Sequence, residues 1–290
     1  MRMFLLALLL AAPAGAQPVD RPIVLPDGRV LNLYCQGKSG PVPGPVVVLD
    51  SGWAADSRAW RRVLVLIPDT VRACAVDRAG QGKSSAGPMP RDGAAVATDL
   101  HAVLTAAKLP GPWLLVGHSL GGLNMRHFAR LYPAEVAGLL LVDPTSPTVP
   151  GAFAPLVARS RGCVETLKAD AEVPAVCRAD DRAAALARWE ARLSEIESAG
   201  GSTSAGLADQ GAGSLAVPLI VLRPGPADRA VEGFSDPLAT LSAKGEARLV
   251  PGSGHMIMID RPEAVVGAIM DIISAAAESS SSALPDQPKS

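Results

Sequence analysis

Short apolar runs that alternate with helix-like stretches are the feature of this sequence that most restricts its fold. A strand needs a continuous apolar run when it is buried on both faces, as in a parallel sheet. Such runs occur at 46–49, 71–76, 113–116, 139–142, 218–222 and 247–250. Apolar residues at helical spacing occupy 94–108, for example, before Pro110-Gly111 ends the pattern. The sequence therefore predicts an α/β fold with a mostly parallel central sheet and helices on both of its faces.

Two segments depart from this alternation. Near the start, strand-like runs at 23–25 and 30–34 are joined through Asp27-Gly28, a pair that favours a tight hairpin turn. Residues from about 145 to 214 are rich in Ala, Arg and Glu and contain a helix-like stretch over 180–198. We interpret the second segment as a helical cap inserted into the α/β domain.

The two ends of the chain differ from the domain between them. Arg2, an apolar run over 4–12 and small residues up to Ala16 are typical of a signal peptide cleaved near Ala16. The run is shorter than the roughly 20 residues that a membrane span needs. Residues 278–290 are polar and are expected to form a disordered tail. These boundaries predict a secreted or periplasmic domain over residues 17–277.

Charge and cysteine content exclude several classes of partner. The chain has 27 basic and 28 acidic residues, so no net field attracts nucleic acid or an anionic membrane. Export makes its four cysteines candidates for disulfides, with three possible pairings, and the Cys-x-x-Cys spacing of zinc sites is absent. We expect a small-molecule substrate, no cofactor and no metal. Nothing fixes the oligomeric state, and a monomer is assumed.

A Gly-x-Ser-x-Gly motif lies between the apolar run at 113–116 and a helix-like stretch, which is the context that gives this motif meaning. It reads Gly117-His118-Ser119-Leu120-Gly121. A serine at such a bend is strained and exposed, and the flanking glycines let the strand and the helix pass each other. Ser119 is therefore the predicted nucleophile, and the backbone N–H of Leu120 is a predicted oxyanion donor.

The serine needs an imidazole that accepts its proton, and the chain has four histidines. His101 and His127 fall in helix-like stretches, and His118 adjoins the serine at a bend where side chains diverge. We expect a structural role for His118. His255 follows the flexible segment 251–254 beyond the last strand and is the predicted base.

The acid that orients the base should follow a strand between Ser119 and His255. Asp228 follows the run at 218–222 and is the first choice. Asp143 ends the run at 139–142 and is the alternative acid, although an Asp-Pro pair also suits a turn. Asp236 ranks third. The second oxyanion donor is expected from the loop after 46–49, where Gly52 lets the backbone approach and the amide of Trp53 is the candidate.

Together these motifs resemble the α/β-hydrolase superfamily over nearly all of residues 20–275. Besides the nucleophile motif, the matching blocks are Asp77-Arg78-Ala79-Gly80-Gln81-Gly82-Lys83-Ser84, Gly225-Pro226-Ala227-Asp228, Gly254-His255 and Asp260-Arg261-Pro262-Glu263. The chain departs from many relatives at 50–52, where Asp50-Ser51-Gly52 replaces a His-Gly pair. In the superfamily's sheet order the second and fourth strands are neighbours, and in this chain they contain Cys35 and Cys74. The resemblance therefore implies a Cys35–Cys74 disulfide. Cys163 and Cys177 would then form a second disulfide within the cap.

The resemblance implies a serine hydrolase that cleaves a carboxylic ester through an acyl-enzyme, as a carboxylesterase or lipase does. The same residues could instead act on an amide, a lactone or a carbon–carbon bond, or in a perhydrolase reaction. A catalytically silent binding protein is the third hypothesis. Phe153, Leu156 and Trp189 in the cap indicate an apolar lining but no particular substrate.

Overall fold

A computed structural model describes residues 18–37, 44–146, 151, 153–169, 171–179, 181–226 and 234–281, with side chains up to residue 278. The predicted signal peptide and Asp228 lie outside these residues.

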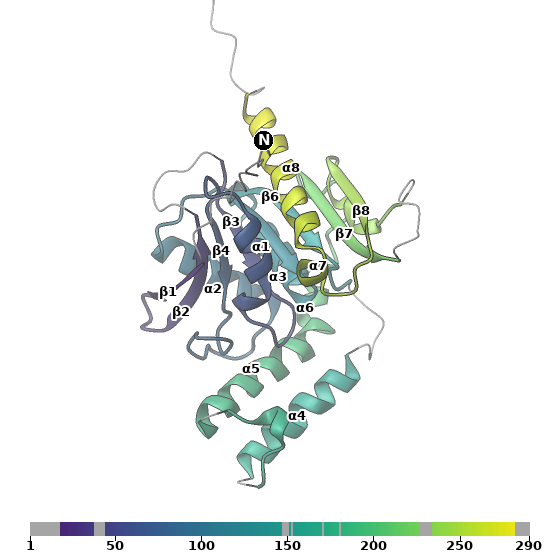
Figure 1. The fold of residues 1–290 in the computed structure, drawn as a ribbon. Coiled ribbons are helices and arrows are strands. Elements are labelled where there is room, and N and C mark those ends of the chain that lie inside the picture. Colours follow the sequence, from purple (N-terminus) through teal and green to yellow (C-terminus); the bar gives the residue numbers. More distant parts are fainter. Residues whose placement is uncertain are drawn as a thin grey trace, which may run out of the picture.

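The described residues form one eight-stranded sheet with the order β1-β2-β4-β3-β5-β6-β7-β8 (Figure 1). The first two strands form the predicted hairpin, β2 is also antiparallel to β4, and the remaining pairs are parallel. The fold predicted from the apolar runs is therefore confirmed. The strands are β1 (Val19–Val24), β2 (Val30–Gln36), β3 (Val47–Asp50), β4 (Ala73–Val76), β5 (Trp113–His118), β6 (Val136–Val142), β7 (Leu219–Gly225) and β8 (Gly245–Pro251).

Helices cover both faces of the sheet because successive strand residues point to opposite sides. Val48 and Leu115 pack with α2 (Gly93–Ala106) and α3 (Leu120–Leu131) on one face. Val47 and Leu114 pack with α1 (Arg61–Leu66) and α8 (Pro262–Ser281) on the other. The described residues also form a short α7 (Ile257–Asp260) and four 3-10 helices, η1 (Ser57–Trp60), η2 (Pro133–Glu135), η3 (Ala175–Cys177) and η4 (Pro237–Leu241).

Helix α8 continues into the segment expected to be a disordered tail. It ends at Ser281, whereas the tail was expected from residue 278, and residues 282–290 lie outside the described part. Three alanines at 275–277 favour the helix directly before this last turn, because alanine favours the helix more than any other residue. None of the helices in the described ranges has the length and apolar character of a membrane span.

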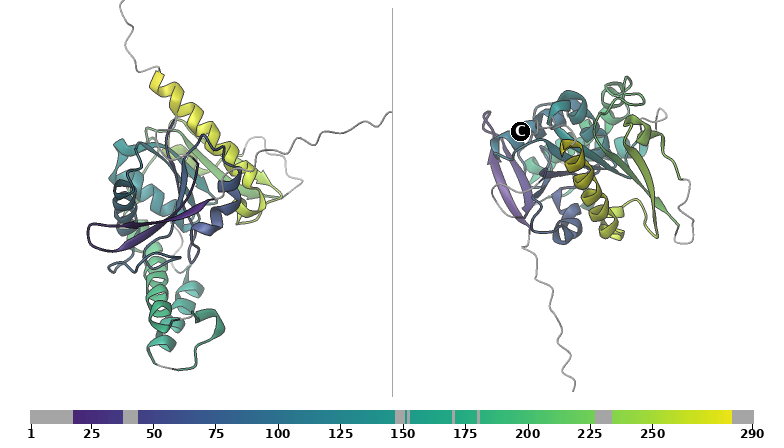
Figure 2. Two further views of the ribbon diagram at one scale, coloured as in Figure 1. Left: turned by 60° about the vertical axis from the view of Figure 1, so that its left-hand side comes forward. Right: turned by 90° about the horizontal axis from the view of Figure 1, so that it is seen from above.

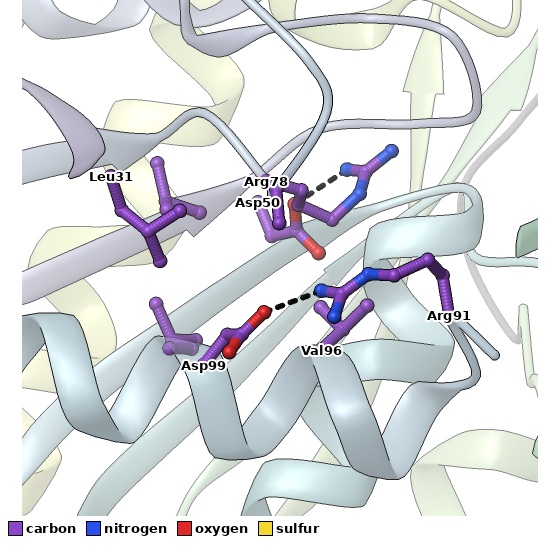
Figure 3. Close-up of a pocket in the computed structure, with 9 residues that line it drawn as sticks. Leu31, Asp50, Arg78, Arg91, Val96 and Asp99 are labelled. Carbon is purple, nitrogen blue, oxygen red and sulfur yellow. Dashed lines mark hydrogen bonds and ion pairs between the residues drawn. The ribbon is translucent and has the colours of Figure 1, made fainter. Parts of the chain in front are cut away.

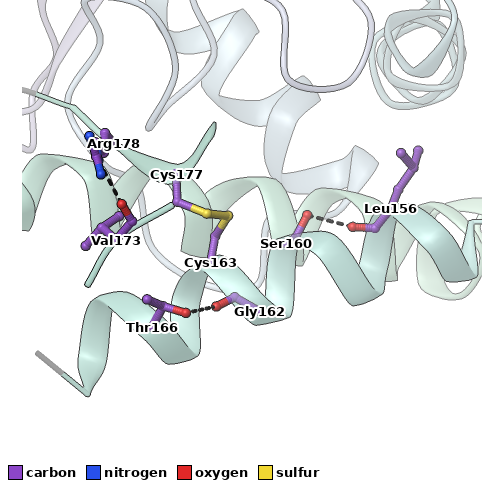
Figure 4. Close-up of a disulfide and its surroundings, with 8 residues drawn as sticks. All are labelled: Leu156, Ser160, Gly162, Cys163, Thr166, Val173, Cys177 and Arg178. Atoms are coloured by element: carbon purple, nitrogen blue, oxygen red, sulfur yellow. Dashed lines mark hydrogen bonds between the residues drawn. A yellow bond between two sulfur atoms is a disulfide. The ribbon is translucent and has the colours of Figure 1, made fainter. Parts of the chain in front are cut away.

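Between β6 and β7 the chain forms a helical insertion, which we define as α4 (Ala154–Lys168), η3, α5 (Arg182–Ala199) and α6 (Ser202–Ala205). Helices α4 and α5 lie side by side and project from the sheet, as two views agree (Figures 1 and 2). A disulfide joins Cys163 on α4 to Cys177 (Figure 4) and packs with the buried Trp189. The insertion thus has a small apolar core of its own.

A second disulfide joins Cys35 to Cys74, which are paired across β2 and β4. These are the two pairs that the resemblance implied. The Cys35–Cys74 disulfide joins residues 39 positions apart, and the Cys163–Cys177 disulfide joins residues 14 positions apart. For loops of these lengths the chain-entropy model gives roughly 4 and 3 kcal/mol of stabilisation, respectively.

Candidate active site

Ser119 lies at a strained bend between β5 and α3. Its backbone angles are φ 50° and ψ −118°, in a region that a side chain disfavours, at a typical cost of about 1–3 kcal/mol. A Cβ on Gly117 would lie 2.4 Å from the carbonyl oxygen of Gly121, and one on Gly121 would lie 2.4 Å from that of Asp50. Both positions therefore require glycine. The Ser119 side chain does not cap α3, which leaves its Oγ free for other chemistry.

The Ser119 hydroxyl faces the loop that follows β6. Its Oγ lies 3.4 Å from Oγ1 of Thr145, and the Thr145 N–H donates to the Ser119 carbonyl over 3.1 Å. No hydrogen bond between described residues joins Ser119 Oγ to His255. Contacts between a nucleophile and its base are often long in unliganded enzymes and shorten when substrate binds. Sequence reasoning did not single out Thr145.

His255 and Asp143 are joined directly. Nδ1 of His255 lies 2.6 Å from Oδ2 of Asp143. Asp143 follows β6 at once, and His255 lies in the loop after β8 with 56% of its side chain exposed. A proton on Nδ1 donates to the carboxylate, which leaves Nε2 free to accept a proton.

Arg223 supports the Asp143 carboxylate from its other side. The Arg223 Nη1 lies 3.0 Å from Oδ1 of Asp143 and 2.8 Å from the carbonyl of Pro144. Burial by itself raises the pKa of Asp143, but the hydrogen bonds from His255 and Arg223 outweigh it, and the pKa lies below its ordinary value. Asp143 is therefore a stable anion beside the imidazole at neutral pH.

The three candidate acids have different places. Asp228, the first choice, lies outside the described residues. The position beside Nδ1 of His255 that we assigned to it is occupied by the alternative, Asp143. Asp236 accepts from Nε of Arg223 over 2.6 Å and caps η4, so it holds Arg223 rather than the base. Our ranking of Asp228 above Asp143 had no support from the topology, because β6 and β7 are neighbours that end at the same edge of the sheet.

His118 holds the loop that carries His255, the predicted base. Its side chain is 2% exposed, and its Nε2–H donates to the His255 carbonyl over 2.9 Å. Burial lowers the pKa of His118 to about 4, so the ring is neutral at physiological pH. The two remaining histidines make other contacts, His101 with Glu135 and His127 with the Thr203 carbonyl.

Arg78 fixes the loop from which the second oxyanion donor was expected. It donates to the carbonyls of Ser51 and Gly52, over 2.7 and 3.1 Å. Its Nη1 also lies 2.6 Å from Oδ1 of Asp50, a pair visible in Figure 3. With two successive carbonyls held by one planar group, the orientation of the next amide, that of Trp53, is restricted. The amide of Leu120 begins α3, where N–H groups have no partner within the helix.

A carboxylate from the helical insertion completes the surroundings of Arg78. Glu195 on α5 accepts from its Nε and Nη2 over 2.8 and 3.0 Å, and both side chains are 2% exposed. Burial alone lowers the pKa of Arg78, but Asp50 and Glu195 raise it above its ordinary value. The loop after β3 and the insertion are therefore joined by the buried groups of Arg78 and Glu195.

Asp50 explains the departure from the His-Gly pair of many relatives. Its Oδ1 binds Arg78, and its Oδ2 accepts from Nδ2 of Asn124 on α3 over 2.8 Å. The carboxylate thus joins the loop after β3 to α3, the helix that follows Ser119. Arg78 lies within a recognised motif, but its partners come from distant segments, and the sequence held no signal that would pair it with Glu195.

Apolar side chains from the insertion meet the expected oxyanion residues. Leu120, Leu123 and Ile196 form a buried cluster, and Trp53, Phe153 and Leu156 pack against it. A pocket of about 300 Å³ between α4 and α5 is lined in part by Phe153, Val157 and Ile196. Phe153 and Leu156 thus have the apolar surroundings expected of them, whereas Trp189 is buried inside the insertion with the disulfide. Over the described ranges, no three His, Cys, Asp or Glu side chains gather as a metal site.

The sheet order, the strained serine after β5 and the histidine after β8 define a hydrolase of the α/β class. The chain belongs to the alpha/beta hydrolase family, whose model matches residues 46–268.

Similar proteins include known esterases. A pimeloyl-[acyl-carrier protein] methyl ester esterase from Chromobacterium violaceum is 38% identical over 104 residues, 36% of this chain and 38% of that protein. The uncharacterized protein YqjL from Bacillus subtilis is 30% identical over 101 residues, 35% of this chain and 40% of that protein. The chain thus spans about two fifths of the length of these relatives. The structure of a thermophilic esterase from Thermogutta terrifontis matches with a TM-score of 0.66 and 24% identity, over 90% of this chain and 99% of that one. This structural likeness concerns the fold alone.

Proposed function

We propose that this protein is a serine esterase in which Ser119 attacks the carbonyl of a carboxylic ester, His255 is the base and Asp143 is the orienting acid. The observation that carries the proposal is the 2.6 Å contact between Nδ1 of His255 and Asp143, at the same edge of the sheet as the strained Ser119. The proposal replaces Asp228 by the residue that occupies its expected place.

In the first half of the reaction, Ser119 Oγ forms a bond to the carbonyl carbon while Nε2 of His255 takes its proton. The amides of Leu120 and Trp53 stabilise the oxyanion, and one such donor typically contributes about 3–4 kcal/mol. His255 then protonates the departing alcohol. In the second half, His255 takes a proton from a water that attacks the acyl-enzyme, and then returns the proton to Ser119 Oγ as the bond to the acyl carbon breaks and the acid is released.

The substrate is proposed to be a small ester with an apolar portion. Support comes from Trp53, Phe153, Leu156 and Ile196, which place apolar surface next to the amide of Leu120. Either the acyl group or the alcohol of the ester fits such a lining. An amide, a lactone or another bond could be cleaved by the same residues, and a panel of substrates distinguishes these possibilities.

The protein is further proposed to be exported, with a signal peptide that ends near Ala16. The two disulfides support this proposal, because disulfides persist mainly in oxidising compartments.

A fluorophosphonate probe tests the proposal, because it phosphonylates activated serines. We expect mass spectrometry to find the label on Ser119, and Ser119→Ala to abolish both labelling and the hydrolysis of p-nitrophenyl esters. Ser274→Ala is the matched control, because among the described residues its hydroxyl bonds only to the Met270 carbonyl of its own helix, α8. Wild-type protein that is folded yet neither labels nor turns over any ester, amide or lactone of the panel would refute catalysis by Ser119.

A further inference from the structure

A second, polar pocket lies between α5 and the two loops that follow β3 and β4. Its volume is about 140 Å³, and four basic side chains line it: Arg58, Lys83, Arg188 and Arg192. Asp56 is the one carboxylate among the described lining residues, and its Oδ1 accepts from the backbone N–H of Arg58. The lining therefore carries an excess of positive charge.

The two arginines of α5 that line the pocket form no ion pair with a carboxylate among the described residues. Arg188 makes no hydrogen bond or ion pair with any residue in the described ranges. Arg192, one helical turn further on, donates to Oε1 of Gln81 over 3.1 Å and to the carbonyl of Ala54 over 3.3 Å, and both acceptors are neutral. Like charges four residues apart destabilise a helix. Burial, and next to it the charge of Arg188, lowers the pKa of Arg192 to about 10.

The remaining two cations share one carboxylate. Lys83 and Arg58 both pair with Asp20 on β1, and about half of each basic side chain is exposed. Two basic groups on one carboxylate leave a net positive charge at this side of the pocket as well. Cations gathered in this way repel one another and attract anions.

The pocket also contains a buried donor that lacks an acceptor. Gln81 lines it and is 1% exposed, and its Nε2 has no hydrogen-bond partner among the described residues. Because Oε1 accepts from Arg192, the amide cannot turn around without bringing two donors together. Buried polar groups are generally satisfied, so the unpaired amide donor of Gln81, close to the unpaired guanidinium of Arg188, indicates a missing acceptor.

We propose that this pocket binds an oxyanion, a phosphate, sulfate or carboxylate group, through Arg188, Arg192 and Gln81. Guanidinium groups recognise these anions in a bidentate manner. The site adjoins the oxyanion loop, because Arg192 donates to Ala54, the residue after Trp53, and the Arg192 carbonyl accepts from Nε1 of Trp53. A bound anion therefore holds α5 of the insertion against that loop. Binding does not depend on the proposed esterase activity.

Isothermal titration calorimetry with inorganic phosphate, at an ionic strength held constant with sodium chloride, tests the site. We expect saturable binding by the wild-type protein and a loss of at least about tenfold in affinity for Arg188→Gln, the usual effect of removing a charge-assisted contact. Arg161→Gln is the matched control, since it removes a cation of the same insertion that is exposed and pairs with Glu197. The control should bind phosphate as the wild type does.

Melting temperatures, measured with and without phosphate, show whether Arg188→Gln loses phosphate binding because it is misfolded. Without phosphate, Arg188→Gln should melt at the same temperature as the wild type or higher, because the substitution relieves repulsion. With phosphate, the melting temperature should rise for the wild type and Arg161→Gln but not for Arg188→Gln. Absence of saturable heat, or the same affinity in all three proteins, overturns the proposal.

Two esters distinguish a free anion from a carboxylate carried by the substrate. If the substrate supplies it, Arg188→Gln raises KM for the p-nitrophenyl monoester of succinate but not for p-nitrophenyl acetate, and phosphate competes with the succinate ester alone. If the anion is free, phosphate changes the turnover of both esters alike. Should neither ester be cleaved, the proposed function fails while the calorimetric test of the pocket still stands.

Discussion

Replacement of Asp143 by asparagine tests the proposed acid most directly. Asparagine keeps an oxygen that can accept from Arg223, but it then turns its NH₂ group toward Nδ1 of His255, which must lose its proton to accept. The imidazole is forced into the tautomer in which Nε2 carries the proton and cannot act as a base. A similar change in a serine protease lowers kcat by about 10⁴, equivalent to roughly 5 kcal/mol of transition-state stabilisation.

The effect on folding should be much smaller than the effect on catalysis. Arg223 keeps its contacts with Asp236 and the Pro144 carbonyl, so Asp143→Asn loses charge-assisted hydrogen bonds of about 1.5–3 kcal/mol in total. Kinetics with p-nitrophenyl acetate and urea unfolding measure the two quantities. Asp228→Asn is the matched control, and its kcat should stay within a few-fold of the wild type. A 10⁴-fold loss for Asp228→Asn with a mild effect at Asp143 would overturn the assignment.

Three further predictions concern the residues that hold the site. His118 is neutral when folded down to about pH 4 but is protonated in the unfolded chain below about pH 6.5, so the unfolded state binds more protons in this window and stability falls as the pH drops. The free energy of unfolding, measured with urea, should fall less between pH 7 and pH 4.5 for His118→Gln than for the wild type, by up to about 3 kcal/mol. The same fall in both proteins would contradict the burial effect. Glu195→Gln leaves Arg78 buried with one carboxylate and should lower the free energy of unfolding by about 3–5 kcal/mol. The control Glu197→Gln, at an exposed ion pair, should lower it by less than about 1 kcal/mol. Equal losses would argue against the buried pair. Gly121→Ala should abolish esterase activity, because its Cβ would overlap the Asp50 carbonyl. The control Gly162→Ala has open space around its Cβ and should raise the melting temperature slightly. An active Gly121→Ala enzyme would contradict the tight bend.

The fold was predictable because each buried parallel strand must appear as a continuous apolar run. β3, β5, β6 and β7 have such runs, and the expected and observed strands overlap throughout. The nucleophile motif was informative for a similar reason. Gly117 and Gly121 must be glycine because other backbone carbonyls lie where their Cβ atoms would be. The motif therefore reflects close packing in the folded protein.

The partners of the site were not predictable because they come from segments far apart in the chain. Asp143 and His255 are 112 residues apart, and Arg78 and Glu195 are 117 apart. Asp228 and Asp143 both follow strands that end at the same edge of the sheet, so only the structure shows which carboxylate lies beside His255. The sequence therefore yielded the residue types of the proposed site but could not choose its acid.

Three side chains that fix the loops of the proposed site share one property: each donates to a backbone carbonyl, Arg78 and His118 from buried positions and Arg223 from a partly exposed one. Arg78 binds the carbonyls of Ser51 and Gly52, His118 binds that of His255, and Arg223 binds that of Pro144. Each loop of the proposed site is thus fixed by a side chain from a neighbouring element rather than by its own sequence. An oxyanion site works through dipoles that need no reorganisation during the reaction, so rigidity of these loops is what the chemistry demands. Because Glu195 belongs to the insertion, that rigidity depends on how α5 is docked, and changes in the insertion should alter turnover as well as substrate choice.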